Sequence, residues 1–528
     1  PLQDVKIQAE PFKHACDLNI EVLLQYDVDK LLAPFLREAG LTPKKPPYGN
    51  WESDGLDGHI GGHYLTALAL HYAATGNQTC KERMEYMIAE LKRCQDASIN
   101  GKGYIGGVPV NGTLDGRKIN LWTELRKGNV AAIWRFWVPW YNLHKTYAGL
   151  RDAWLYANNE QAKKMFLELC DWGVELISHL DDRQMESMLG NEFGGMNEVY
   201  ADAYQIEPKP EYLVAAKRFS HKHLFDSMAK RVDNLDNMHA NTQVPKAVGY
   251  QRVAELTNDK AYVDASQYFW ETVVHNRTLA FGGNSRSEYF PELNKHSDYI
   301  HERQGPESCN TYNMMKLTEG LFRMDPKAEY VNFYERAMFN HILSTQHPTH
   351  GGYVYFTPAV PGHYRVYSAP EKAMWCCVGS GMENHAKYGQ FVYTHSTDHK
   401  ELYVNLFVGS ELNWKQKNAK IKQITDFPYE ESSKIVVDVK RSTRFAMKIR
   451  RPWWAKEFKA MCKGVDYAAN SKPGEYIVID RKWKKGDVVQ IDMPMEMTIE
   501  EMPNVPYMVS VMRGPILMAA KTNDERMY

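Results

Sequence analysis

Two short clusters of metal-ligating residue types lie far apart in the sequence. The first is Glu307-Ser308-Cys309 and the second is the adjacent pair Cys376-Cys377. Together they offer one carboxylate and three thiolates, the ligand number and softness that tetrahedral zinc prefers. Closed structural zinc sites usually use only cysteine and histidine, so the carboxylate favours a site that does chemistry. A buried helix cysteine beside an unrelated pair is the alternative, as is a vicinal disulfide, and spacing alone does not choose.

The residues around both clusters indicate how they could reach one ion. Cys309–Phe322 has helical periodicity. Ligands two residues apart do not share a helix face, so we expect Glu307 just before the helix or in its first turn. We expect the glycines of Gly379-Ser380-Gly381 to allow an irregular backbone that turns both cysteines of the pair toward the ion. A thiolate held there can attack a carbon electrophile, or the site can be purely structural and pin two distant segments together.

A candidate acid precedes these clusters. Glu288 follows the glycine-rich run Gly282-Gly283-Asn284, and a carboxyl on such a loop can reach into a cleft and be tuned as a general acid. A single loop glutamate is more often solvated, and the position of Glu288 shortly before Glu307 is what makes it a candidate.

Histidines form a second group of polar candidates. His59 and His63 are four residues apart, so they share a face on a helix. No glutamate completes the H-E-x-x-H pattern of a zinc peptidase. Beside Trp51 and Glu52 they suit sugar hydroxyls, and satisfied core histidines are an equal alternative. Further polar candidates of this kind are His144, His239 and Gln243.

Composition and charge exclude several classes of protein. With 528 residues, the chain is too long for one ordinary core, so we expect two or more domains. A net charge of -1 leaves no broad basic face for nucleic acid. No apolar run approaches the length of a membrane span. The aromatic content of 12% suits sugar-stacking clefts and large cores alike.

The remaining cysteines do not form a disulfide pattern. They are Cys16, Cys80, Cys94, Cys170 and Cys462. Several lie in helical patterns, where we interpret them as small buried hydrophobic residues. No signal peptide is visible and Pro1 is an unusual natural start, so we expect a mature or trimmed chain. We expect a bacterial periplasmic or secreted location, with the cytoplasm left open.

The first three quarters of the chain has the periodicity of helical hairpins. Helical stretches stop at Thr75-Gly76-Asn77, Asn158-Asn159, Thr257-Asn258-Asp259 and Asp325-Pro326, and each is followed at once by another. About a dozen helices before residue 390 fit a ring of six hairpins, an (α/α)6 barrel, and a superhelical solenoid would also fit. The long glycine- and aromatic-rich connections, such as Gly190–Met196 and Gly351–Pro361, favour a binding face at one end of the ring.

The pattern changes near residue 390. Short β-rich runs, many of which alternate apolar and polar residues, predict an antiparallel β-sandwich over residues 391–528. We therefore expect a mainly helical fold with an all-β domain: an (α/α)6 barrel over residues 10–390, followed by the sandwich. Residues 1–9 contain a short strand, Val5–Ala9, that could join the sandwich.

An ordered series of motifs resembles a known family. The series runs through Trp51-Glu52, Gly58-His59-x-x-Gly62-His63, Pro139–Lys145, Gly194-Gly195-Met196-Asn197-Glu198, His239–Gln243, Gly282–Ser285, Glu307–Thr311 and Cys376-Cys377. It is similar to the β-L-arabinofuranosidases of glycoside hydrolase families 127 and 146, and the resemblance spans most of residues 1–390. It implies an (α/α)6 barrel with β-sandwich domains, a zinc ion held by a glutamate and three cysteines, and a retaining mechanism with a cysteine nucleophile.

Carried over motif by motif, the resemblance assigns residues to roles. The zinc ligands would be Glu307, Cys309, Cys376 and Cys377, with Cys376 as nucleophile. Glu288 would be the acid/base, and Glu292 is the spare candidate. Sugar contacts would come from Trp51, Glu52, His59, His63, His144, Asn197, His239 and Gln243.

The resulting expectation is an exo-acting glycosidase that removes terminal β-L-arabinofuranose from plant-type glycans. The alternatives are the same chemistry on another pentofuranose or a related sugar, and a non-catalytic glycan-binding protein with a structural zinc. The expected partner is a carbohydrate, and the sequence defines no oligomeric state.

Overall fold

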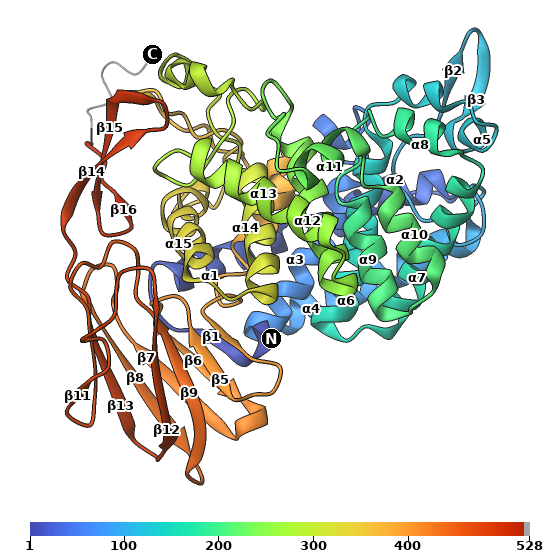
Figure 1. Ribbon diagram of the computed structural model, residues 1–528. Helices are drawn as coiled ribbons and strands as arrows, with labels where there is room; N and C mark the ends of the chain where they lie inside the picture. The colour runs from blue at the N-terminus through green and yellow to red at the C-terminus, as the bar shows by residue number, and fades with distance from the viewer. Residues whose placement is uncertain (522–528) are drawn as a thin grey trace.

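Six nearly fully buried helices form a closed inner ring. A computed structural model describes residues 1–521 of the protein. In this ring each helix contacts the next, and the last contacts the first. A helix that is buried on all sides belongs to the centre of a fold. The helical part of the molecule occupies the centre and right of Figure 1. The six helices are α3 (His59–Thr75), α6 (Pro139–Ala157), α9 (Met196–Ile206), α12 (Ala240–Thr257), α14 (Ser308–Met324) and α16 (Cys376–Asn384).

Amphipathic helices surround this ring. Five of them directly follow an inner helix and pack against it: α4 (Gln78–Ala97), α7 (Glu160–Ser178), α10 (Pro210–Arg218), α13 (Lys260–Asn276) and α15 (Ala328–Ala337). Of the two N-terminal helices, α1 (Phe12–Gln25) contacts α3 and α2 (Val28–Glu38) packs on α4. Asn19 of α1 also donates to the Met382 carbonyl in α16, 2.8 Å away. The predicted (α/α)6 barrel is confirmed.

The predicted hairpin signals work as helix caps. Gly76 and Asn158 end α3 and α6 in the left-handed conformation, with φ of 74° and 55°. Asn77 then accepts from the Cys80 amide at 3.0 Å, and Asn159 caps α7 in the same way at 2.9 Å. Such tight connections make successive helices antiparallel, so all six inner helices begin at the same end of the ring.

The connections that enter the inner helices are long and gather at that end. They carry several short elements, and the hairpin of β2 and β3 projects from the barrel at the upper right of Figure 1. These elements are η2 (Asn50–Glu52), β2 (Asn111–Leu114), β3 (Arg117–Asn120), α5 (Leu121–Arg126), η3 (Val130–Arg135), α8 (Asp182–Met188), α11 (Lys222–Ala229) and η4 (Leu293–His301). After α15 the chain continues through the short turns η5 (Met338–Ile342) and η6 (Leu343–Thr345).

Two sheets form the sandwich seen at the lower left of Figure 1. The seven-stranded sheet has the order β1-β6-β7-β8-β13-β10-β11, and the four-stranded sheet has the order β12-β9-β5-β4. The N-terminal strand β1 (Val5–Ile7), which follows η1 (Leu2–Asp4), pairs with β6, and Val5 lies opposite Leu412. The other strands are β4 (Tyr393–His395), β5 (Glu401–Val404), β6 (Ser410–Trp414), β7 (Ala419–Ile424), β8 (Ser432–Val439), β9 (Thr443–Arg450), β10 (Lys459–Cys462), β11 (Val465–Asp466), β12 (Tyr476–Trp483) and β13 (Asp487–Asp492), with η7 (Lys415–Lys417) between β6 and β7.

The sandwich differs from the prediction in two respects. Strands β5 and β9 pair in parallel, so the sheets are not wholly antiparallel. A separate three-stranded sheet follows β13, made of β14 (Met497–Met502), β15 (Val505–Arg513) and β16 (Ile516–Leu517). Its alternating sequence looks like a sandwich strand, but the apolar face of the β14–β15 pair is exposed, as Ile499 and Val509 are 71% and 53% accessible. The predicted boundary at 528 lies outside the described residues.

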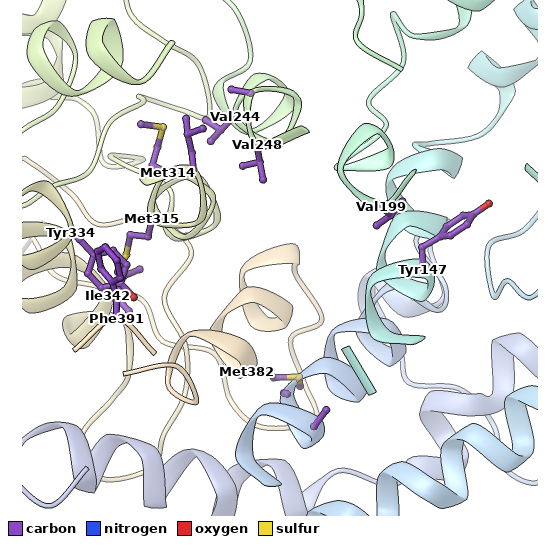
Figure 2. Packing of buried hydrophobic residues seen from close by; sticks show 14 of the residues in the cluster. Tyr147, Val199, Val244, Val248, Met314, Met315, Tyr334, Ile342, Met382 and Phe391 are labelled. Atoms are coloured by element: carbon purple, nitrogen blue, oxygen red, sulfur yellow. The ribbon is translucent and has the colours of Figure 1, made fainter. Parts of the chain in front are cut away.

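A continuous apolar core joins the barrel to the sandwich. Figure 2 shows Met315, Tyr334, Ile342 and Phe391 gathered at this junction, and the rings of Tyr334 and Phe391 are 4.8 Å apart. A fully buried ion pair between Glu335 of α15 and Arg450 of β9 adds a polar link. Among the described residues, no helix combines the length and apolar character that crossing a membrane requires.

Candidate active site

The two predicted ligand clusters meet at the helix-entry end of the barrel. Glu307, Cys309, Cys376 and Cys377 are all buried, and each offers a ligand atom within 4.8 Å of the others. Glu307 is the residue that precedes α14, as predicted. The Sγ atoms of Cys376 and Cys377 are 3.8 Å apart, so these cysteines are free thiols and not a vicinal disulfide.

The spacing of these atoms fits one tetrahedral ion. With zinc–sulfur bonds of about 2.3 Å, tetrahedral geometry separates two sulfurs by about 3.8 Å. Cys376 and Cys377 meet this value, and their Sγ atoms lie 3.6 and 3.7 Å from Glu307 Oε1. Glu307 Oε2 is buried and has no hydrogen-bond partner within the described chain, which a cation would satisfy. The donor set and its spacing therefore suit a metal ion.

The cysteine pair is held differently from the sequence-based expectation. Cys376 and Cys377 are the first two residues of α16, so no irregular backbone presents them. The following glycines serve close packing instead: a Cβ on Gly379 would lie 2.2 Å from His63 Cδ2, and one on Gly381 would lie 2.6 Å from the Tyr353 ring. Adjacent residues of a first turn can both reach an ion that lies off the helix end.

The three thiols differ in acidity. Burial acts to raise the pKa of Cys309, yet hydrogen bonds from Cys376 and Cys377 outweigh it and lower that pKa to about 7. Hydrogen bonding to Cys309 raises the pKa of Cys376, and burial is the main cause of the raised pKa of Cys377. Burial also raises the pKa of Glu307 well above its usual range. The cluster thus holds protons that a cation would displace.

Glu288 lies beside this cluster on a strained turn. Its φ is 72°, a conformation that is uncommon for a glutamate. The Tyr355 hydroxyl donates a hydrogen bond to its carboxylate, and His239 Nε2 is 3.7 Å from Oε2. Burial acts to raise the pKa of Glu288, but the contacts with His239 and Tyr355 outweigh it and lower the pKa. The side chains of Glu288 and His239 are 33% and 26% exposed, so solvent reaches this side of the cluster.

Glu292, the spare acid candidate, is placed differently. It forms an ion pair with Lys295 at 2.9 Å and accepts from Asn237 at 3.2 Å. Glu292 therefore has surface partners. Glu288 accepts from Tyr355, which packs against the cysteines, so Glu288 is the glutamate that lies beside the cluster.

His63 and His144 present unpartnered nitrogens next to the cysteines. His63 Nδ1 bonds to the Glu383 carboxylate, which also accepts from the Tyr312 hydroxyl at 3.0 Å. His144 Nδ1 is 3.1 Å from Lys145 Nζ. Burial lowers the pKa of both histidines, so both are neutral near pH 7. The Nε2 atoms of both lack a hydrogen-bond partner among the described residues, and both rings line a cavity of about 70 Å³ that Cys309 also borders.

The side chains of four other predicted sugar contacts form hydrogen bonds within the protein. Glu52 accepts from the backbone amides of Gly58 and Ile60, at 2.8 and 2.7 Å, and so caps the start of α3. The remaining three also have protein partners: His59 Nδ1 with the Leu56 carbonyl at 2.7 Å, Asn197 Nδ2 with the Lys246 carbonyl at 2.9 Å, and Gln243 Oε1 with Lys246 Nζ at 3.0 Å. His59 Nε2, like the same atom of His63 and His144, is buried and has no hydrogen-bond partner among the described residues. Trp51 lies differently, because it packs against the cysteine cluster and stays partly exposed.

Several site residues were not singled out from the sequence. Tyr355 bonds Glu288, Tyr141 packs on the cysteines, and burial raises the pKa of Glu192, whose charge acts on Glu288 and His239. Tyr355 and Glu192 do lie in loops whose aromatic and glycine content predicted a binding face. Their individual roles depend on contacts between distant segments, which composition does not reveal.

Comparisons with known proteins agree with this arrangement. Residues 4–390 match the family described as β-L-arabinofuranosidase, GH127 catalytic domain, and residues 401–495 match the corresponding middle domain. A relative from Bifidobacterium longum subsp. longum, named non-reducing end β-L-arabinofuranosidase, is 20% identical over 540 residues, which covers 97% of this chain and 72% of the relative.

Solved structures agree as well. A β-L-arabinofuranosidase of the same family from Geobacillus stearothermophilus superposes with a TM-score of 0.73 at 17% identity, covering 97% of this chain and 86% of the other. A second family member, named β-arabinofuranosidase, gives a TM-score of 0.73 at 16% identity, covering 98% and 84%. The resemblance inferred from the motifs is thereby confirmed. The chain belongs to glycoside hydrolase family 127, the family of the β-L-arabinofuranosidases, and is a glycoside hydrolase.

Proposed function

We propose that this protein is a retaining β-L-arabinofuranosidase that releases terminal β-L-arabinofuranose from plant-type glycans. The observation that carries the proposal is the convergence of Glu307 and three cysteines beside Glu288. The family supports the sugar, since the relatives described above are named for this activity.

Cys376 is the proposed nucleophile. Its 6% exposure exceeds the 3% of Cys309 and the 1% of Cys377, so it is the most accessible of the three. Tyr355 lies between the two proposed catalytic groups. Its hydroxyl donates to Glu288. The hydrogen bond with Cys309 raises the pKa of Cys376, and an interaction with Tyr355 acts against this rise. Retaining glycosidases need such a close pair, normally two carboxyls about 5 Å apart; here a thiolate replaces one carboxylate.

The reaction has two steps with balanced proton transfers. In the first, the Cys376 thiolate attacks the anomeric carbon while protonated Glu288 gives its proton to the departing oxygen, which forms a carbon–sulfur bond and breaks the glycosidic bond. In the second, Glu288 as carboxylate takes a proton from water, and the hydroxyl displaces sulfur. The two inversions give net retention.

The proposed cofactor is zinc held by Glu307, Cys309, Cys376 and Cys377. Zinc bound there supplies positive charge that keeps the thiols ionised and lowers the basicity of sulfur, which makes it a better leaving group. His63 and His144 are proposed sugar contacts, because each has a neutral, unpartnered nitrogen beside the cluster.

A screen of nitrophenyl furanosides and pyranosides under reducing conditions tests the proposal. The expected result is turnover of the β-L-arabinofuranoside above all others. Turnover of a different pentofuranoside would favour the first alternative substrate class. Binding without turnover on every sugar would instead support a non-catalytic glycan-binding protein.

A further inference from the structure

Aromatic rings lead outward from the cysteine cluster to the protein surface. Trp51 and Tyr355 both pack against the cysteines, and their ring centroids are 6.0 Å apart. The next ring is Trp137, whose centroid is 4.9 Å from that of Trp51 at an interplanar angle of 64°. Three separate segments of the chain supply these rings, so their alignment is a property of the fold.

Trp137 is the exposed end of this series. It is 44% accessible, so part of the indole faces solvent. Asn191 Nδ2 donates to the Trp137 carbonyl at 3.0 Å and fixes the backbone. Gly55, with φ of +119°, brings its backbone against the indole, because an added Cβ would lie 3.8 Å from Trp137 Cε3. The ring is therefore positioned and open to a ligand.

The position of Glu288 indicates which part of a substrate would contact these rings. Glu288 protonates the departing oxygen in the proposed reaction, and Tyr355, its hydrogen-bond donor, is the neighbour of Trp51. A group on that oxygen that extends past Tyr355 would meet Trp51 next and then Trp137. Aromatic rings bind the apolar C–H faces of sugars and leave the hydroxyls in water.

We infer that Trp51 and Trp137 form the subsite that binds the sugar ring attached to the departing oxygen. The inference rests on the proposed function and adds the residues that bind the leaving group. Trp134 provides a matched control, since it is an indole of the same connection, 61% exposed, that packs near Gly190.

The test compares two substrates in three variants. The ratio of kcat/KM for a β-L-arabinofuranose disaccharide to that for methyl β-L-arabinofuranoside is measured in the unaltered protein, Trp137→Ala, Trp137→Phe and Trp134→Ala. Loss of an apolar stacking surface should lower this ratio about tenfold in Trp137→Ala. Trp137→Phe should recover part of it, and Trp134→Ala should keep the original ratio. Thermal unfolding of each variant checks that the fold is intact.

Two results would overturn the inference: an unchanged ratio in Trp137→Ala, or an equal decrease in Trp134→Ala. Absence of turnover of both substrates in the unaltered protein would count against the proposed function alone. Calorimetric titration with the disaccharide then decides the subsite separately. Weaker binding in Trp137→Ala than in Trp134→Ala would support it, and equal binding would refute it.

Discussion

The hydroxyl of Tyr355 donates a hydrogen bond to the carboxylate of Glu288, while the backbone carbonyl of Tyr355 accepts from the Ser308 amide at 3.0 Å. Ser308 stands between the proposed ligands Glu307 and Cys309. Tyr355 therefore contacts both the proposed acid, through its hydroxyl, and the segment that carries Glu307 and Cys309, through its backbone carbonyl.

The acidity of Glu288 depends on that hydroxyl. The acid must hold its proton in the first step, so kcat/KM should fall as pH rises above the lowered pKa of Glu288. Tyr355→Phe removes a hydrogen bond that favours the charged carboxylate, so the pKa rises and the falling limb of the pH profile should move to higher pH. Tyr403→Phe, which removes a tyrosine–glutamate hydrogen bond in the sandwich, is the control. A limb that stays in place in Tyr355→Phe would refute this role.

The metal prediction concerns stoichiometry. We expect about one zinc per chain by elemental analysis of freshly purified protein, and much less in Cys309→Ala, because the variant lacks one of the four proposed ligands. Cys462→Ala, which removes a buried cysteine of β10, should retain the metal. Equal zinc in Cys309→Ala and the unaltered protein would remove Cys309 from the site.

Cys376 should be indispensable for turnover. A serine hydroxyl is neither a thiolate nor a good zinc ligand, so Cys376→Ser should lower kcat on the order of 1000-fold or more. The comparison is with Cys462→Ser, which should keep normal activity. Substantial activity in Cys376→Ser would show that another group is the nucleophile.

Gly379 should be needed for the packing of α16 against α3. A methyl group at this position would lie 2.2 Å from the His63 ring, so Gly379→Ala should destabilise the protein by about 1–3 kcal/mol in urea unfolding. Gly49→Ala adds the same methyl group where nothing lies within 4 Å, and its free energy of unfolding should change little. Equal stability of the two variants would contradict the proposed reason for this glycine.

Local signals predicted the fold better than they predicted the site. Asn77 and Asn159 cap helices because their side chains bond amides three residues away, which a sequence reveals directly. Gly379 was misinterpreted, since its reason is the His63 ring on another helix. Glu52 has a polar side chain of the type that binds sugars, yet its carboxylate caps the first turn of α3. Tyr355 could not be identified, because its partner Glu288 is 67 residues away along the chain.

The most direct test of the account is to trap the glycosyl-enzyme. In Glu288→Gln, an activated nitrophenyl β-L-arabinofuranoside needs no proton to leave, whereas the second step lacks its base, so the covalent species should accumulate. Glu292→Gln is the matched control and should turn over normally, because Glu292 pairs with Lys295 away from the cysteines. Peptide mass spectrometry should find one pentose on Cys376. A pentose attached to a carboxylate instead would show that the cysteines are structural and that the protein uses two carboxyl groups.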